Sequence, residues 1–180
     1  TRLGVVKENI QAVEPLVRKA DCISIDSCSL QSTYIPEIKD AKIYGLSGEE
    51  ACQICWYGGQ SPTCSSFGIY NLQKLQQESS SCFVFATMIW YFIEGFYNRK
   101  GSTGFLSGNF FIYEVHTGED PETIRFYKNK QTEAWWMEVP VNNAGGLFNR
   151  NRMIPCDYGD YEKALAGDIP EKWIDFRSKS

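Results

Sequence analysis

The sequence predicts an α/β protein with a parallel β-sheet, followed by an antiparallel hairpin and short helices. Up to about Tyr97, segments with helical periodicity alternate with short apolar segments, the order expected of right-handed crossover units on a parallel sheet. The first apolar segment ends in polar residues, as parallel strands do at the carboxyl edge of a sheet. From Asn109 onward the period becomes two, which is typical of antiparallel strands.

The totals indicate one domain. The chain has 180 residues, of which 43% are hydrophobic, enough for one sizeable core. We expect residues 1–108 to belong to the α/β domain, and residues 109–180 to form a hairpin and helical extension packed on it. The net charge of −4 provides no basic surface, so nucleic acid is not an expected partner.

The chain also lacks the signals of membrane and secreted proteins. Its longest apolar run, Cys82 to Ile93, is shorter than a membrane span, and no signal-peptide pattern opens the chain. The seven cysteines are an odd number and are spread through predicted helices and strands, unlike those of a disulfide scaffold. We therefore expect a cytoplasmic protein with no membrane partner. Because the chain starts at Thr1 without an initiator Met, we take this start to be a cut edge.

The first elements follow from periodicity. Apolar residues at helical spacing predict an amphipathic surface helix from about Lys7 to Ala20, in which Pro15 introduces a kink or marks a late start. Residues 22–26 predict a buried parallel strand that carries its polar side chains at the carboxyl end. Residues 29–46 show no period and predict a loop.

The next helix has a clear start signal. Ser47 as N-cap with Glu50 three residues later forms a capping box, and Gly58 with Gly59 is expected to end the helix. Small and apolar residues from Cys64 to Asn71 predict a second strand. An aromatic-rich helix is expected from about Ser81 to Tyr97.

The last third predicts antiparallel strands and short helices. A hairpin is expected from about residue 109 to 128, with a turn at 118–121, and a further strand at 135–140. Residues 157–166 predict a helix stopped by Gly167, and residues 170–176 a last turn. Residues 142–152 and the two termini are long enough to be disordered.

A candidate site lies where the first strand ends. Ser24-Ile25-Asp26-Ser27-Cys28-Ser29-Leu30-Gln31-Ser32 resembles the Ser-x-Asp-x-Asp-x-x-Asp-Pro signature of ureohydrolases, the superfamily of arginase, agmatinase and formimidoylglutamase. In that family the segment ends a central strand and supplies manganese ligands. The resemblance implies the carboxy-terminal half of an arginase-like, three-layer α/β/α domain with manganese as cofactor.

Three positions depart from that signature. Ser24 and Asp26 match it, whereas Cys28, Gln31 and Ser32 replace its remaining residues. Two hard divalent ions need several anionic oxygen ligands, and the hydroxide that they generate attacks the guanidinium carbon. The candidate metal ligands are therefore Asp26 and Cys28, and a thiolate favours softer ions than manganese. The structural alternative for Asp26 is a strand-end carboxylate that is a relic of the fold or caps a neighbouring amide. The structural alternative for Cys28 is a small buried hydrophobic residue.

The second strand carries a candidate substrate position. The family strand ends in a Glu that pairs with the guanidinium or formimino group, and the resemblance places Asn71 there and Lys74 at a family Pro. A neutral Asn cannot balance the positive charge of a buried guanidinium group. Burial of that cation without a counter-ion costs several kcal/mol of free energy.

Longer segments carry the resemblance further. They are similar to a bacterial branch of the formimidoylglutamase or arginase family, and together they extend over most of residues 2–176. These segments are 88–100, 126–128 through 135–140, and 154–158, and residues 44–50 separately resemble the Gly-Leu-Ser/Thr-x-x-Glu helix entry of the wider family.

Other reactive residue types have simpler interpretations. Cys52 and Cys55 have no second cysteine pair at zinc spacing, so we expect structural cysteines. His116, the only histidine, sits in a hairpin strand without an acidic neighbour and is expected to be a surface or interface residue. Glu49 and Glu50 occupy a first helical turn, where acids favour the helix dipole. The aromatic side chains around Trp90 indicate core or subunit contact, and Trp135 and Trp136 should point to opposite faces.

Three functional hypotheses follow. The first is a ureohydrolase-fold protein whose ancestral reaction is metal-dependent hydrolysis of a guanidino or formimino C–N bond. The second is a non-catalytic subunit or scaffold, which the loss of charge at Cys28, Gln31 and Asn71 favours. The third is a small-ligand module that uses the crevice beside loop 29–46.

The expected partners follow from the same resemblance. The family's other metal ligands belong to an amino-terminal half that this sequence does not contain. We therefore expect a partner that supplies this half or a homologous subunit. Exposed strand edges and apolar helix faces favour a homo-oligomer.

Overall fold

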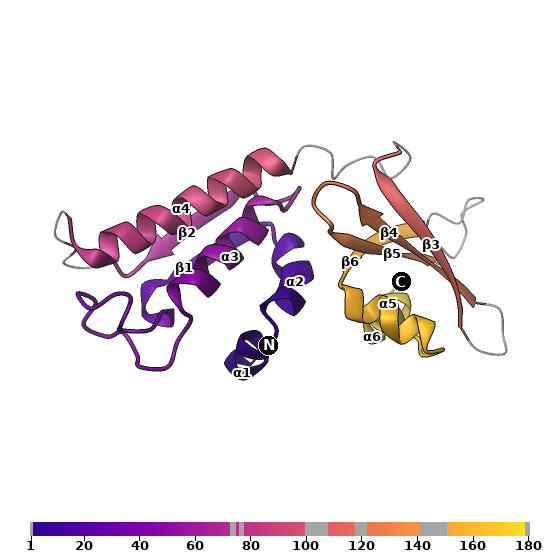
Figure 1. The fold of residues 1–180 in the computed structure, drawn as a ribbon, viewed down its shortest axis with the longest axis horizontal. Helices are drawn as coiled ribbons and strands as arrows, with labels where there is room; N and C mark the ends of the chain where they lie inside the picture. Colours follow the sequence, from indigo (N-terminus) through magenta and orange to yellow (C-terminus); the bar gives the residue numbers. More distant parts are fainter. Residues whose placement is uncertain are drawn as a thin grey trace. The chain divides into compact units, whose positions relative to one another are not determined.

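The chain forms two compact units, Thr1–Gly101 and Ser102–Ser180, each with its own sheet. The structure is a computed structural model of the chain, and it describes residues 2–72, 75, 78–99, 108–117, 122–140 and 151–178. Unit 1 contains a parallel sheet and unit 2 an antiparallel one, which confirms the expected α/β class with a parallel sheet and an added hairpin (Figure 1).

The sheet of unit 1 consists, within the described residues, of two parallel strands. Strand β1 (Cys22–Asp26) pairs with β2 (Ser66–Tyr70), and Asp26 lies opposite Tyr70 at the carboxyl end. Ile23 and Ile25 face the core, whereas Cys22, Ser24 and Asp26 are exposed. The prediction of a fully buried strand is therefore wrong for one face, because only one layer of described helices covers the pair.

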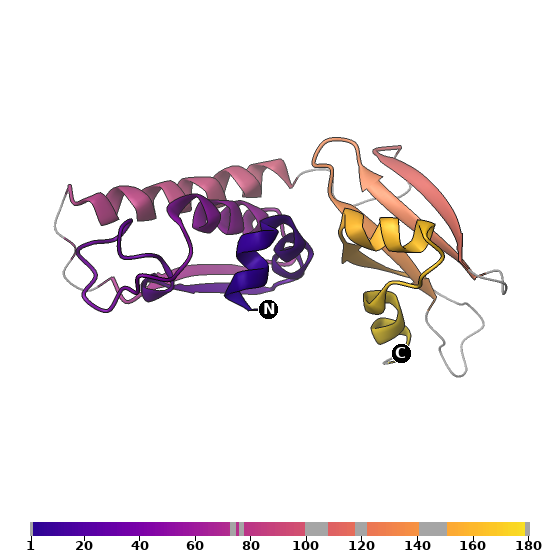
Figure 2. The ribbon, with the colours of Figure 1, turned by 60° about the horizontal axis from the view of Figure 1, so that its bottom comes forward.

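Helices α3 (Gly48–Gly59) and α4 (Ser80–Asn98) cover that buried face side by side (Figure 2). The predicted capping box of Ser47 and Glu50 is confirmed, since each side chain accepts a hydrogen bond from the other residue's backbone N–H. Ser79 caps α4 through Cys82 N. The core of unit 1 is formed mainly by aliphatic and sulfur side chains: Ile23, Ile25, Leu30, Ile35, Ile38, Ala51, Cys52, Cys55, Cys64, Phe85 and Met88.

Glycines bring α3 and α4 into close contact. A Cβ on Gly59 would collide with the backbone of Phe92 and Phe96, and one on Gly95 with the carbonyl oxygen of Trp56. The predicted end of α3 at Gly58 and Gly59 is confirmed, although both glycines are still helical and the C-cap is Gln60. Both glycines are buried. Gly59 lies where the backbones of α3 and α4 approach each other, whereas a Cβ on Gly58 would collide with the side chain of Ile23.

The helix predicted for residues 7–20 is divided into three short helices, and the interruption predicted at Pro15 is confirmed. The segment forms α1 (Leu3–Glu8), the 3₁₀ helix η1 (Ile10–Val13) and α2 (Glu14–Arg18). The side chain of Asn9 accepts a hydrogen bond from Gln11 N and starts η1, and Pro15 stands in the first turn of α2, where its missing N–H costs nothing.

Unit 2 is a four-stranded antiparallel sheet in the order β3-β4-β5-β6. The strands are β3 (Phe110–Thr117), β4 (Glu122–Asn129), β5 (Trp135–Pro140) and β6 (Asn151–Cys156). The predicted hairpin and the strand at 135–140 are confirmed, and the predicted turn at 118–121 lies outside the described residues. Residues 151 and 152, expected in a disordered segment, belong to β6. This edge strand tolerates Pro155, which obscured its pattern.

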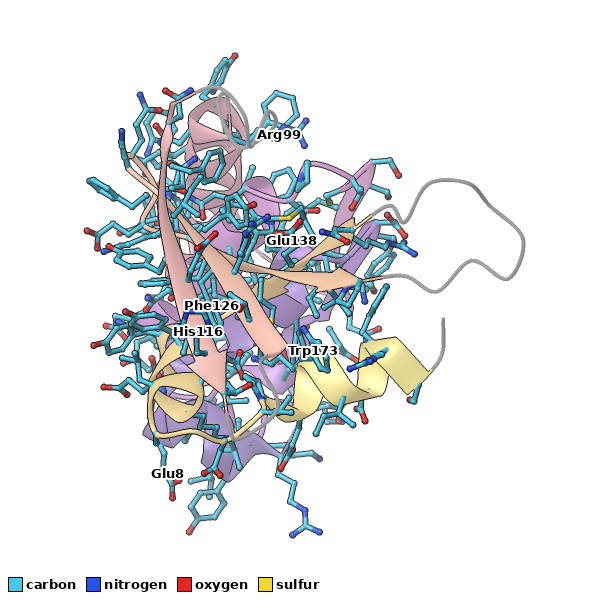
Figure 3. The ribbon with its side chains drawn as sticks, turned by 90° about the vertical axis from the view of Figure 1, so that its right-hand side faces the viewer. Glu8, Arg99, His116, Phe126, Glu138 and Trp173 are labelled. Carbon is cyan, nitrogen blue, oxygen red and sulfur yellow. The ribbon has the colours of Figure 1, made fainter. Side chains whose placement is uncertain are left out.

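Two helices complete unit 2. Asp157 caps α5 (Tyr158–Leu165), and α6 (Glu171–Ser178) follows. Trp173 of α6 lies against the sheet and donates from Nε1 to Glu138 O at 3.2 Å, near buried Phe126 (Figure 3). Trp135 belongs to this core, whereas Trp136 packs in a second cluster with Phe110 and Ala134, so the two rings point to opposite faces as predicted.

No helix among the described residues is both long and apolar enough to cross a bilayer.

Candidate strand-end site

The structure brings Asp26 and Asn71 together at the carboxyl ends of β1 and β2. Asp26 is the last residue of β1, and Asn71 follows Tyr70, the last residue of β2. Asn71 Nδ2 donates a hydrogen bond to Asp26 Oδ2 at 2.9 Å. The two predicted site residues therefore contact each other directly, because parallel strands end at the same edge of a sheet.

The second oxygen of Asp26 organises the turn after β1. Asp26 Oδ1 accepts a hydrogen bond from Cys28 N at 2.9 Å and so caps η2 (Ser27–Ser29), whereas Ser29 Oγ donates to Asp26 O at 2.7 Å. Both carboxylate oxygens thus have a hydrogen-bond donor within the chain. The predicted alternative, a strand-end carboxylate that caps a neighbouring amide, describes this arrangement.

Asn71 is held in an uncommon backbone conformation. Its φ is 61°, in the left-handed region that Asn tolerates better than most residues. The hydroxyl of buried Ser27 donates to Asn71 O at 2.9 Å. The backbone contact through Ser27 and the side-chain contact through Asp26 together orient the Asn71 amide toward the carboxylate.

The hydrogen bonds also set the charge of the site. The amide of Asn71, followed by the N–H of Cys28, lowers the pKa of the Asp26 carboxyl below its ordinary value, against a smaller opposing effect of desolvation. Asp26 is exposed and therefore carries a negative charge at neutral pH.

The remaining positions of the resembled signature do not complete a manganese site. Gln31 Nε2 donates to Gly45 O at 3.2 Å, so its amide is used to hold loop 29–46. Cys28 is partly buried and packs against the core of unit 1, and its thiol also forms a hydrogen bond with the Asp26 carboxylate that slightly lowers the pKa of Asp26. One carboxylate, one thiol and neutral amides cannot offset the charge of two hard cations. This donor set does not fit a manganese pair, and the described residues contain no cluster of three His, Cys, Asp or Glu that could hold a metal.

The remaining reactive residues have structural environments. Cys52 and Cys55 are buried, and burial raises the pKa of both thiols, that of Cys55 to about 12. A protonated thiol is neither a metal ligand nor a nucleophile. His116 is exposed, and its Nδ1 lies 2.9 Å from Thr123 Oγ1, which agrees with a surface histidine (Figure 3).

Sequence reasoning missed a groove in unit 1. A cavity of about 590 Å³ lies between α3 and α4, beside loop 29–46. Its lining includes two carboxylates, four aromatic rings and a thiol: Glu49, Glu94, Tyr34, Trp56, Phe83, Tyr91 and Cys52. The lining residues of α3 and of α4 are each spaced so that they fall on one face of their helix, which the sequence shows. Only the packing of the two helices shows that these two faces line one cavity. This groove lies on the helix layer and is not the crevice that was expected at the strand ends beside loop 29–46.

Comparison with known proteins gives one similarity. Crystal structures of oxidised formiminoglutamase from Trypanosoma cruzi, at pH 4.6 and with Mn²⁺ at pH 6.0 and 8.5, are 32% identical to this chain over 43% of its length, with a TM-score of 0.41. The match covers 27% of the formiminoglutamase chain. A TM-score this low does not by itself assign a family. No family model matches the sequence, and no curated protein does.

Proposed function

We propose that unit 1 is a ureohydrolase-like module whose strand-end site has become structural, and that the chain acts as a non-catalytic subunit. The observation that carries this proposal is the hydrogen bonding of Asp26. Asn71 donates to one carboxylate oxygen and the Cys28 N–H to the other. In this site the carboxylate holds the ends of β1 and β2 together.

The direction of the departures supports the same function. Cys28, Gln31 and Asn71 all stand where the resembled family has a carboxylate, and none of them is an acid. A loss of charge at each position removes what a manganese pair and a guanidinium require. The resemblance of Ser24-Ile25-Asp26 and of the longer downstream segments is the reason for proposing this ancestry.

A hydrolase is the second candidate. The exposure of Asp26 and its lowered pKa favour it, because an ionised and accessible carboxylate is able to share a metal ion with ligands from another chain. The reaction would be hydrolysis of a formimino or guanidino C–N bond in an assembly that includes those ligands.

An activity assay separates the two candidates. The purified chain is incubated with manganese and with formimino and guanidino compounds, and release of formamide, ammonia and urea is measured. We expect no release above that of the Asp26→Ala variant. Release by the natural protein that Asp26→Ala abolishes would overturn the proposal.

A variant designed to bind manganese tests whether the replaced carboxylates explain the weak metal binding that we propose. The double substitution Cys28→Asp and Asn71→Glu places two further carboxylates beside Asp26. We expect it to bind manganese at least tenfold more tightly than the natural protein in calorimetric titration, since hard cations select anionic oxygens. Equal binding by both proteins would show that these positions do not control metal affinity.

The open edges of the sheet support a homologous subunit as partner. Within the described residues β1 and β2 pair only with each other, which leaves the outer edge of each strand unpaired. We propose that another copy covers such an edge, and that residues 109–180 form an extension of the same subunit. Sedimentation equilibrium should show a dimer or larger species, and a monomer at high micromolar concentration would contradict this.

A further inference from the structure

We propose that the groove between α3 and α4 binds an elongated organic dication with an apolar middle. The lining of the groove includes Glu49 from the first turn of α3 and Glu94 from the last part of α4, together with apolar and aromatic residues from both helices. This site lies on the helix layer, away from the strand ends, and does not depend on the function proposed for Asp26.

The first acidic group is held in place at the start of α3. Tyr34 OH donates to Glu49 Oε2 at 3.0 Å. Hydrogen bonds from its own backbone N–H and from Tyr34 lower the pKa of the Glu49 carboxyl, so it is charged at neutral pH. Neighbouring Glu50 is already used by the capping box and by Lys7 Nζ at 3.1 Å. Glu49 is therefore the carboxylate of this turn that remains for a ligand.

The second acidic group comes from the last part of α4. Glu94 precedes Gly95, which lies against Trp56, and Trp56 is two helical turns beyond Glu49. Since each turn rises about 5.4 Å, the carboxylates are on the order of 11 Å apart along the helices. The ion pairs of the described residues involve neither Glu49 nor Glu94. The groove thus has two negative charges without a cation.

The walls between the two charges suit an apolar cation. Trp56 and Tyr91 contribute aromatic rings, which attract cations through their faces as well as burying methylene groups. Cys52 is buried, and desolvation together with the charge of Glu49 raises the pKa of its thiol, so it contributes a neutral surface. A cavity of about 590 Å³ is within the range of small-molecule sites.

Charge decides among the occupants. The described residues of α3 and α4, from Gly48 to Gly59 and from Ser80 to Asn98, include three acids and no Lys or Arg. A second copy of the same face would bring these acids together, which is unfavourable. An anion or a fatty acid is disfavoured for the same reason, so the complementary ligand carries positive charge at both ends.

Titration calorimetry with three probes of equal chain length tests this proposal. The probes are 1,8-diaminooctane, octylamine and suberate, which carry two positive charges, one positive charge and two negative charges. We expect the diamine to bind at least fivefold more tightly than octylamine, and suberate not to bind. Equal affinity of the diamine and octylamine, or binding of suberate, would overturn the proposal.

Two variants of equal charge locate the site. Glu94→Gln should reduce the affinity for 1,8-diaminooctane to that of octylamine. Glu8→Gln, which removes an exposed acid of α1 outside the groove, should leave it unchanged (Figure 3). Equal losses in both variants would show that the diamine responds only to net charge. Amide chemical shifts confined to α3 and α4 serve as the second readout and confirm that both variants are folded.

Discussion

The two units bury their sheets in different ways. In unit 2, aromatic residues pack on both faces of the four-stranded sheet, with α5 and α6 over one of them. In unit 1, the described residues cover one face of a two-stranded pair, and α4 leaves Phe83, Trp90 and Tyr97 each 65% exposed. Unit 2 thus buries side chains on both faces of its sheet. In its described residues, unit 1 has its core on one face only and depends on the close packing of α3 and α4 over it.

The largest expected effect is in the core of unit 2. Phe126 is fully buried between the sheet and Tyr161, and Phe126→Ala should reduce the free energy of unfolding by about 3–5 kcal/mol. Phe111→Ala on the same sheet is the control, because that ring is 51% exposed and should cost far less. Amide hydrogen exchange of β3–β6 is the readout, and similar losses in both variants would remove the distinction between core and surface.

The next effect belongs to the helix contact of unit 1. Gly95→Ala places a Cβ against the backbone of Trp56, which cannot move without separating α3 from α4. We expect a loss of about 1–3 kcal/mol, measured by exchange of the α3 and α4 amides. Gly4→Ala is the control, since nothing lies near its Cβ. An unchanged Gly95→Ala variant would refute the close approach.

An ion pair between helices of unit 2 should have a smaller effect. Lys172 Nζ donates to Asp157 and Asp160, both at 2.6 Å. Burial alone would lower the pKa of Lys172, but the two hydrogen bonds outweigh it and raise the pKa. Its stabilising contribution is therefore present at neutral pH and is lost as the pH rises through that raised pKa.

The substitution that tests this pair is Lys172→Met. It leaves the buried carboxylate of Asp160 without its cation, so we expect a loss of about 1–2 kcal/mol at pH 7. Lys163→Met, at an exposed position of α5, should change stability little. Urea unfolding of the three proteins decides the outcome, and equal midpoints would contradict it.

The smallest expected effect is a shift in pKa at the strand ends. Asn71→Gly keeps the left-handed backbone accessible but removes the amide donor, so the pKa of the Asp26 carboxyl should rise toward its ordinary value of 3.8. A carboxyl group whose pKa is lower in the folded than in the unfolded protein stabilises the fold at pH values above its unfolded pKa. The natural protein should therefore lose this contribution to stability as the pH falls through the folded pKa of Asp26. Carbon NMR of Asp26 gives the pKa. Glu133→Gly, at another left-handed position, should not change it.

The sequence predicted those parts of the fold that local chemistry determines. Ser47 and Glu50 marked the start of α3, and the alternation around Tyr113 marked the first hairpin strand. The end of α3 was also predicted, but the contact of Gly59 with α4 was not, because α4 lies far away in the sequence. Strand β6 was missed since Pro155 interrupts its pattern, and an edge strand tolerates such a residue.

The same division holds for the candidate site. The positions of Asp26 and Asn71 at neighbouring strand ends follow from the parallel order of the strands. Their direct hydrogen bond depends on the left-handed backbone at Asn71 and on the Ser27 hydroxyl, which no periodicity reveals. The groove beside Glu49 was missed because its two rows of residues come from helices that meet only in the folded chain.

Manganese content tests the central claim most directly. The natural protein is dialysed against micromolar manganese, separated from free metal, and its bound manganese is determined by elemental analysis together with protein concentration. Because the carboxylate of Asp26 accepts hydrogen bonds from Asn71 and Cys28, we expect far less than one equivalent of bound manganese per chain. Two equivalents that are lost in Asp26→Ala would contradict a structural role for Asp26 and favour the hydrolase.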